Sequence, residues 1–288
     1  MSNSHAKVWL ITGCSTGFGL ALTRIVLQRG HKVIATSRDP SRTPELVQEV
    51  TDGGGHWTAL DVTSDHLEQD IQQIEDRLGQ IDVLVNNAGY SLLGAFEDLS
   101  VQDAREQMET NFFGPLRIIR AVLPGMRERR GGTMVNISST AGVRALPTYS
   151  LYSASKFAME GLSEGLASEV AAFNVRVILV EPGAFYTNFL TSGSAAYRPV
   201  SEVYRDTETG RRLASLQAMH AQQRGDPVKA ARRIFDTVMG EGMAAGRQTY
   251  LRLPLGPDCL EAVRQKLGQL QENYDAMEDI ASSTDRAP

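Results

Sequence analysis

A tyrosine and a lysine stand four positions apart in the segment Tyr152-Ser153-Ala154-Ser155-Lys156. On a helix, such residues share one face about 6 Å apart, so the Lys156 ammonium would lie beside the Tyr152 phenol. The pKa of an unperturbed tyrosine is about 10, and a close, poorly solvated cation lowers that pKa because it stabilises the phenolate. We therefore expect Tyr152 to act as a general acid/base near neutral pH, exchanging a proton with a ketone or alcohol.

The same spacing also occurs on many surface helices, so it needs a second signal. The segment Asn136-Ile137-Ser138-Ser139 supplies it, because this segment ends an apolar run thirteen residues before the tyrosine. A hydroxyl there could hold a carbonyl oxygen beside the Tyr152 phenol.

A glycine-rich segment, Thr12-Gly13-Cys14-Ser15-Thr16-Gly17-Phe18-Gly19, joins the first apolar run to a helical pattern. Glycines let a backbone turn sharply and approach a pyrophosphate, and a helix N-terminus offers free N–H groups. The spacing differs from the commonest dinucleotide fingerprint, and a simple tight turn is the alternative. Its place directly after the first strand favours a nicotinamide dinucleotide, whose oxidised ring would add a second positive charge near Tyr152.

The tip of the second strand, Thr36-Ser37-Arg38-Asp39, bears on the choice of coenzyme. An acid at this point would bind the ribose hydroxyls of NAD, whereas an arginine accommodates the additional phosphate of NADP. Ser37 stands where the acid is expected and Arg38 follows it, which favours NADP(H) over NAD. Asp39 competes with this interpretation, but it precedes Pro40 and is expected to open the next turn.

Two further strand ends carry polar residues. Asp61-Val62 follows the third strand, where the aspartate can accept a hydrogen bond from the adenine amine. Asn86-Asn87-Ala88-Gly89 ends the fourth. We expect Asn86 to tie neighbouring strands together, and Asn87, Ala88 and Gly89 to line the adenine ribose.

The elements that must position these residues alternate regularly along the chain. Short apolar runs, several nearly continuous in Val, Ile and Leu, predict strands buried on both faces of a parallel sheet. These runs are Val8–Ile11, Lys32–Ala35, Trp57–Leu60, Val83–Val85, Met134–Ile137, Val175–Val180 and Thr249–Leu253. Helices are predicted over Leu20–Gln28, Ser64–Leu78, Val101–Arg129 and Ala154–Phe173, with Pro115 kinking or dividing the third. This βαβα order predicts a Rossmann-type, doubly wound α/β sheet of about seven strands, with helices on both faces.

With these motifs in order, the sequence resembles the short-chain dehydrogenase/reductase family over residues 7–190. The glycine loop, the Asn86–Gly89 motif, the trio Ser139, Tyr152 and Lys156, and the turn at Pro182-Gly183 carry the resemblance. It implies that Ser139 orients the substrate oxygen and that Lys156 binds the nicotinamide ribose. Phe18 departs from the isoleucine or leucine that the family often has.

The resemblance also implies roles for two single residues. Asn111 would hold a water beside the lysine and continue a proton relay; the alternative is a helix-interior amide that bonds backbone. Thr187 would bond the nicotinamide carboxamide, cap a helix, or do both.

The segment at about 184–224 lacks a clear strand and is predicted to form a substrate lid. The aromatic residues of this segment, together with apolar residues that the motifs place nearby, predict an apolar pocket for a medium-sized hydrophobic ketone or secondary alcohol. The residues are Phe185, Tyr186, Phe189, Leu190, Tyr197, Tyr204, Leu92, Leu93, Leu146 and Tyr149. The alternative is that half of these aromatics belong to the core.

Residues 256–281 predict an amphipathic C-terminal helix, with apolar residues at three-to-four spacing from Leu260 to Met277. We expect this helix to pack on its own domain; a contact in a homodimer or homotetramer is the alternative.

Composition excludes several other classes. The 288 residues are 42% hydrophobic and 22% charged, as in one soluble α/β domain spanning 1–288. A net charge of −5 argues against a nucleic-acid partner. Two cysteines allow no disulfide framework and no apolar run suits a membrane span, so we expect a cytoplasmic protein. No metal site is indicated.

The sequence therefore predicts an NADP-dependent carbonyl reductase/alcohol dehydrogenase. Two alternatives use the same fold. One is a non-redox isomerase or cyclase, and the other is a catalytically silent dinucleotide-binding sensor.

Overall fold

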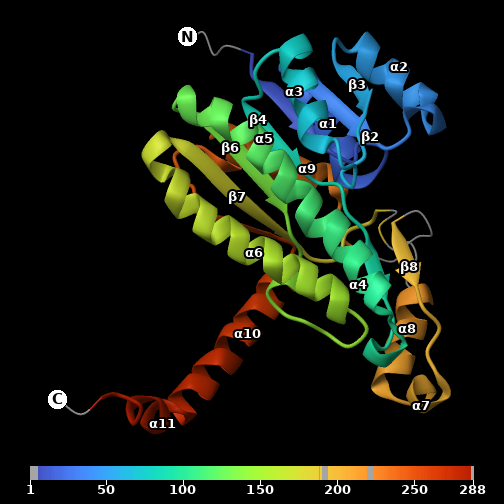
Figure 1. The fold of residues 1–288 in the computed structure, drawn as a ribbon, viewed down its shortest axis with the longest axis vertical. Coiled ribbons are helices and arrows are strands. Elements are labelled where there is room, and N and C mark those ends of the chain that lie inside the picture. Colours follow the sequence, from blue (N-terminus) through green and yellow to red (C-terminus); the bar gives the residue numbers. More distant parts are fainter. Residues whose placement is uncertain (1–5, 188, 190–193, 219–222, 287–288) are drawn as a thin grey trace.

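The computed structural model describes residues 6–187, 189, 194–218 and 223–286. At its centre lies a seven-stranded sheet in the order β3-β2-β1-β4-β6-β7-β9, with every neighbouring pair parallel (Figure 1). The strands are β1 Val8–Ile11, β2 Lys32–Ser37, β3 His56–Ala59, β4 Val83–Asn86, β6 Gly132–Ile137, β7 Val175–Pro182 and β9 Arg252–Leu255. The order reverses between β1 and β4, which confirms the predicted doubly wound Rossmann-type fold.

Alternate residues of the central strands feed two separate cores, one on each face of the sheet. Trp9 and Ile11 of β1 pack with α1 (Gly17–Gln28) and α9 (Pro227–Met239), and Trp9 stacks on Phe235 at 5.6 Å. Leu10, between them, packs into the opposite core. That second core is built by α3 (Leu67–Leu78), α5 (Gly114–Glu128) and α6 (Ser150–Val170). Both faces are buried, so the strand sequences are nearly continuously apolar.

The predicted helix over Val101–Arg129 is divided, as the proline suggested. α4 (Val101–Met108) passes through a π-helical turn at Glu109–Phe113 into α5. Pro115 takes the second position of α5, directly after the π-helical turn, so the residue that cannot donate lies where the helix changes its hydrogen-bonding pattern. The wider turn brings Asn111 into the protein interior, where it is buried.

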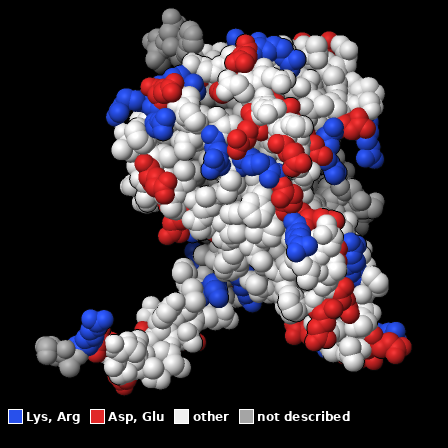
Figure 2. Space-filling view, viewed as in Figure 1, with Lys and Arg blue, Asp and Glu red and all other residues white. Residues whose placement is uncertain are grey.

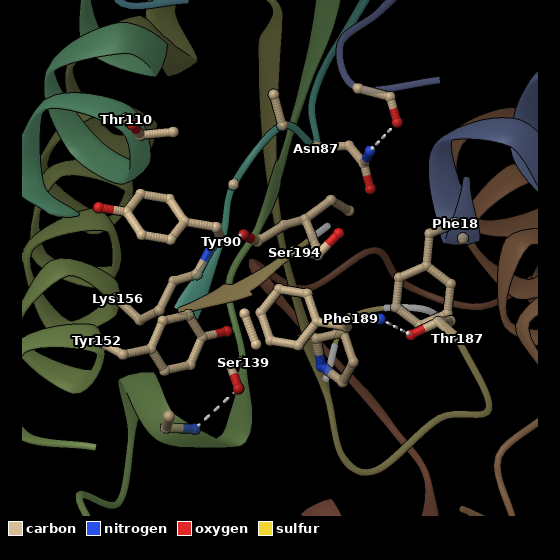
Figure 3. Close-up of a pocket in the computed structure, with 18 of the residues that line it drawn as sticks. Phe18, Asn87, Tyr90, Thr110, Ser139, Tyr152, Lys156, Thr187, Phe189 and Ser194 are labelled. Atoms are coloured by element: carbon tan, nitrogen blue, oxygen red, sulfur yellow. Dashed lines mark hydrogen bonds between the residues drawn. The ribbon is translucent and has the colours of Figure 1, made fainter. Parts of the chain in front are cut away.

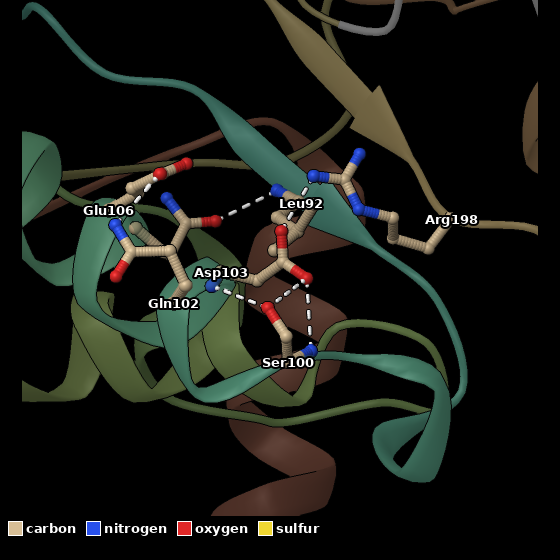
Figure 4. A network of polar contacts seen from close by, with 7 residues as sticks. Leu92, Ser100, Gln102, Asp103, Glu106 and Arg198 are labelled. Atoms are coloured by element: carbon tan, nitrogen blue, oxygen red, sulfur yellow. Dashed lines mark hydrogen bonds and ion pairs between the residues drawn. The ribbon is translucent and has the colours of Figure 1, made fainter.

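The segment expected to lack a strand contains one. β8 (Ala195–Tyr197) pairs in parallel with β5 (Ser91–Leu93), and α7 (Glu202–Arg205) and α8 (Glu208–Ala218) follow. A three-residue strand is too short to show a periodic pattern, which is why no signal for it stands in the sequence. Arg198, just after β8, donates to Asp103 of α4 at 2.6 Å and fastens this segment to the body (Figure 4).

The expected packing of the C-terminal helix on its own domain is wrong. α10 (Pro257–Ala276) and α11 (Glu278–Ser282) extend away from the body as an arm that is largely white in Figure 2. Leu267 and Tyr274 of the apolar stripe are 60% and 69% exposed. Helical periodicity identifies an apolar face but does not say what covers it. In the described part of the chain, no helix is both long and apolar enough to span a membrane.

Candidate active site

A cleft of about 1060 Å³ follows the carboxyl ends of β1, β2, β4, β6 and β7, the edge at which doubly wound sheets bind ligands. It brings together all the predicted site residues except two, Gly19 and Asn111, which lie behind its wall. Figure 3 shows part of it. The predicted residues that line it are Gly13, Ser15, Thr16, Gly17, Phe18, Ser37, Arg38, Asp61, Val62, Asn87, Ala88, Gly89, Ser139, Tyr152, Lys156, Pro182, Gly183 and Thr187.

The glycine loop closes tightly on itself. Gly13 and Gly17 have φ of +70° and +58°, a region that side chains disfavour. A Cβ on Gly19 would lie 2.4 Å from the Gly13 carbonyl oxygen, so Gly19 lets the loop close instead of facing the cleft. Thr16 precedes α1 in an extended conformation, and no side chain caps this helix N-terminus. Its N–H groups therefore suit an anionic ligand such as a diphosphate.

The tip of β2 separates two polar residues by their surroundings. The Ser37 hydroxyl is buried and accepts from Trp57 Nε1 at 3.0 Å. Arg38 is exposed at the cleft and forms no ion pair with any described residue. Asp39 Oδ1 accepts from the Ser41 N–H and hydroxyl, which confirms that Asp39 opens the next turn. Of these three residues at the end of β2, Arg38 is therefore the one that presents an unpaired charge to the cleft.

The next two strand ends are braced by their own polar groups. Asp61 Oδ1 accepts from the Thr63 N–H at 2.9 Å, which fixes its carboxylate at the cleft. Asn86 Nδ2 donates to Asn136 Oδ1 at 2.9 Å and ties β4 to β6, as expected. Asn87 Nδ2 donates to the carbonyl oxygens of Thr12 and Gly13, so this side chain steadies the glycine loop.

The strand end of β6 and the first turns of α6 bring the three expected catalytic residues together (Figure 3). The Ser139 hydroxyl accepts from the Ala141 N–H at 3.1 Å and hydrogen bonds with the Tyr152 phenol. Lys156 Nζ lies 5.8 Å from the centre of the Tyr152 ring and donates to the Ile137 carbonyl oxygen at 2.8 Å. Tyr152 and Lys156 are only 4% and 6% exposed.

Burial dominates the acid–base properties of this pair. It raises the pKa of Tyr152, and the hydrogen bond from Ser139 opposes that rise only in part. Burial also lowers the pKa of Lys156 to about 8, against the opposing effect of the Glu160 carboxylate. The expected lowering of the tyrosine pKa is therefore not produced by the protein alone, because both groups lose hydration in the same site.

The amide of Asn111 is fully engaged within the protein. Its Oδ1 accepts from Tyr90 N–H at 3.1 Å, and its Nδ2 donates to the Tyr90 carbonyl oxygen and to Ser155 Oγ. A Cβ on Gly89 would lie 3.1 Å from Asn111 Oδ1 and 3.8 Å from Lys156 Nζ. The backbone-bonding alternative thus describes the amide, and a water beside the lysine stays a prediction.

The turn after β7 forms the far wall. Thr187 Oγ1 accepts from the Phe189 N–H at 3.2 Å, while its methyl group faces the position of a Cβ on Gly17. Asp258 of α10, which sequence analysis missed, accepts from the Ala184 N–H at 2.6 Å. The arm is therefore anchored at its base, beside Pro182-Gly183.

Only part of the predicted apolar set forms the substrate end of the cleft. Tyr149 and Phe189 lie 5.9 and 5.7 Å from the Tyr152 ring, and Leu146 and Phe185 line the same space. The other aromatics and leucines stand apart. Tyr186 is exposed, Leu92 and Leu93 are buried in β5, Tyr197 and Tyr204 do not line the cleft, and Leu190 lies outside the described residues.

Several lining residues carried no sequence signal. Tyr90, Arg144 and Arg212 reach the cleft from two loops and from α8. None belongs to a motif: Tyr90 and Arg144 lie in loops that follow β4 and β6, and Arg212 reaches the cleft from the segment at about 184–224.

The chain is similar to known dehydrogenases and oxidoreductases over most of its length. A family model described as short chain dehydrogenase matches residues 7–197. The chain is 43% identical to "Oxidoreductase claN" of Passalora fulva, over 75% of this chain and 98% of the relative. A short-chain dehydrogenase from Streptomyces avermitilis superposes with a TM-score of 0.88 at 39% identity, covering 99% of this chain and all of that one. The closed form of a serine dehydrogenase complexed with NADP+ superposes at 0.70, with 29% identity, covering 87% of this chain and 94% of the other.

Proposed function

The chain belongs to the short-chain dehydrogenase family of oxidoreductases, and from this premise we propose that it is an NADP-linked carbonyl reductase/alcohol dehydrogenase. Its substrate in this proposal is a medium-sized hydrophobic ketone or the matching secondary alcohol. The observation that carries the proposal is that one cleft has the glycine loop at one end and Ser139, Tyr152 and Lys156 at the other.

The cleft suits a nicotinamide dinucleotide along its whole length. The uncapped N-terminus of α1 offers N–H groups to a diphosphate. Among the described residues, the Lys156 ammonium donates to the Ile137 carbonyl oxygen alone, which leaves its other N–H groups without an acceptor. Those N–H groups would bind ribose hydroxyls. The unpaired Arg38 favours the 2′-phosphate of NADP, and the NADP+ held by the related serine dehydrogenase supports the same choice.

The residues of the protein would divide the work of proton transfer. Ser139 holds the substrate oxygen, and Tyr152 donates a proton to that oxygen in reduction or accepts one in oxidation. When bound, the coenzyme supplies or accepts the hydride and, in its oxidised form, adds a positive charge that opposes the effect of burial on the tyrosine. Lys156 contributes its ammonium from the next helical turn.

The substrate end is closed by residues that lie far along the chain. We assign the segment at about 184–224 the role of a lid on a single catalytic domain, because Phe185, Phe189 and Arg212 reach the cleft from it. Apolar side chains there exclude water from the reacting atoms and favour a hydrophobic substrate.

A spectrophotometric assay tests the proposal. The purified protein is mixed with NADPH or NADH and a panel of ketones and aldehydes, and the loss of reduced coenzyme is followed. We expect turnover with hydrophobic ketones and a preference for NADPH. Failure to oxidise either coenzyme with any carbonyl compound would refute the proposed activity, and equal use of both would refute only the coenzyme preference.

A further inference from the structure

Two arginines line the cleft near the lid, and no carboxylate of the described residues forms an ion pair with either. Arg144 donates to the neutral amide of Gln265 on α10 at 2.6 Å. Arg212 of α8 lies over the face of the Tyr149 ring, with its Cζ 5.7 Å from the ring centre. The residues outside the described part include no Asp or Glu, so no acidic side chain remains there to pair with them.

The acidic residues that line the cleft are engaged elsewhere. Glu109 pairs with Arg117, Glu106 accepts from Gln102, and Asp258 accepts from the Ala184 N–H. Asp61 holds the turn at the end of β3. The positive charge of Arg144 and Arg212 is therefore left for something that enters the cleft.

Arg212 carries a further sign of an absent partner. Its Nε is fully buried and has no hydrogen-bond acceptor among the described residues. A buried donor without an acceptor is unfavourable, and a guanidinium can offer Nε and Nη together to one carboxylate. Leu213 and Leu216 of the same helix pack into a small core with Leu93 and Tyr149, so the arginine stands on an anchored element.

The Tyr149 ring joins this arginine to the chemistry. One neighbour of the ring is the Tyr152 ring at 5.9 Å, and another is the Arg212 guanidinium at 5.7 Å. A ligand of medium length can therefore contact both residues at once. Leu146 and Leu216 line the cleft with them and would cover an apolar middle section.

We propose that the substrate carries a carboxylate or another oxyanion on an apolar chain, and that Arg212 binds this group while the carbonyl lies at Tyr152. Arg144 adds a second positive charge to the lining of the cleft. This inference rests on the proposed carbonyl reduction and names the substrate class of that site. An apolar lining raises the strength of the charge interaction because it lowers the local dielectric.

The test uses decanoic acids that carry a ketone at successive carbons, together with their methyl esters. The acid and ester of each pair differ only in charge at the far end. We expect the wild-type protein to favour the acid, and Arg212→Gln to lower the acid-to-ester ratio of kcat/KM by about tenfold or more. Arg212→Lys, which keeps a charge without the fork, should recover part of that ratio.

Arg211→Gln is the matched control, because Arg211 is exposed and donates to the Asp206 carbonyl oxygen outside the cleft. Its acid-to-ester ratio should equal that of the wild type. Inhibition by decanoate, measured against decanol, gives a second readout that needs no turnover of the probe. Arg212→Gln should weaken inhibition by decanoate and leave inhibition by decanol unchanged. In Arg211→Gln, both inhibitors should act as they do on the wild type.

The outcomes separate this inference from the activity itself. If the wild type reduces the esters and acids equally well and Arg212→Gln matches Arg211→Gln, the anionic substrate is refuted while carbonyl reduction stands. If decanoate binds no better than decanol and Arg212→Gln changes neither, the anionic substrate is refuted even where no member of the series is reduced, and the ketone and aldehyde panel then decides whether carbonyl reduction itself fails. A fall in the ratio that is confined to Arg212→Gln supports the proposal.

Discussion

Lys156 and Tyr152 lie one helical turn apart on α6, with the lysine Nζ 5.8 Å from the centre of the tyrosine ring. The lysine is held there by a 2.8 Å hydrogen bond to the Ile137 carbonyl oxygen, so its ammonium is fixed between the helix and the end of β6. Burial acts on both residues, raising the pKa of the phenol and lowering that of the ammonium to about 8. The protein thus holds two groups in their neutral forms more readily than water would.

Tyr152→Phe removes the proposed acid while it keeps the ring. We expect kcat to fall by at least about a hundredfold, the usual contribution of a positioned acid, while the coenzyme still binds. Steady-state kinetics and a coenzyme titration measure the two effects. Tyr250→Phe, at a 68% exposed tyrosine, is the control. Retained turnover in Tyr152→Phe would show that a group other than Tyr152 exchanges the proton with the substrate oxygen.

Lys156 gives folding a pH dependence that can be measured directly. The folded protein releases the lysine proton near pH 8, whereas the unfolded chain keeps it until about 10.5. Between these values the unfolded state binds more protons, so stability rises with pH. In denaturant unfolding without coenzyme, the free energy of unfolding of the wild type should rise relative to that of Lys156→Met as the pH rises through this window. The exposed Lys229→Met should follow the wild type; a constant gap for Lys156→Met would contradict the assignment.

Arg38→Gln tests the proposed choice of coenzyme. Removing an unpaired guanidinium from a 2′-phosphate site should raise the KM for NADPH by about tenfold, with a much smaller effect on NADH. Arg42→Gln removes a nearby exposed arginine that does not line the cleft and serves as the control. Equal changes for both coenzymes would show that Arg38 does not contact the phosphate.

Gly19→Ala should damage the coenzyme loop without touching the coenzyme. The new Cβ would lie 2.4 Å from the Gly13 carbonyl oxygen and 2.6 Å from the side-chain atom Asn87 Nδ2, so the backbone and this side chain would have to move apart. We expect weaker coenzyme binding and a lower Tm. Gly161→Ala, inside α6 with nothing near its Cβ, should instead gain about 0.5–1 kcal/mol. Wild-type affinity and stability in Gly19→Ala would contradict the tight loop.

Arg252 neutralises two buried carboxylates and is expected to matter for folding. Its Nη1 donates to Glu160 and, at 2.7 Å, to Glu181, which are 5% and 2% exposed. Arg252→Met should cost about 3 kcal/mol, because it leaves these charges buried and unpaired. Thermal unfolding measures this loss, and Arg264→Met on the exposed arm is the control.

The loss should depend on pH in a defined direction. Burial raises the pKa of Glu160 above its ordinary value of 4.5, so the folded state favours the protonated acid. Loss of Arg252 raises that pKa further, so the deficit of Arg252→Met should shrink as the pH falls from neutrality toward 4.5 and grow toward neutrality. A deficit that is independent of pH would place its origin in packing instead.

The sequence by itself determined the sheet and most of the cleft. Buried parallel strands must be apolar on both faces, and their ends must meet at one edge. The residues after β1, β2, β4, β6 and β7 could therefore be assigned to one site from the order of the apolar runs. The four-residue spacing of Tyr152 and Lys156 likewise determined their common face, because helical geometry is local.

The tertiary structure alone decided the rest. Contacts between distant segments place Arg212 over Tyr149 and join β5 to β8, and neither contact has a local periodicity to reveal it. The sequence showed the apolar stripe of α10, but it did not show that this helix extends away from the body. An amphipathic pattern identifies an apolar face and does not say which surface covers it. The acid–base balance of Tyr152 also depended on burial, which arises only when the chain has packed.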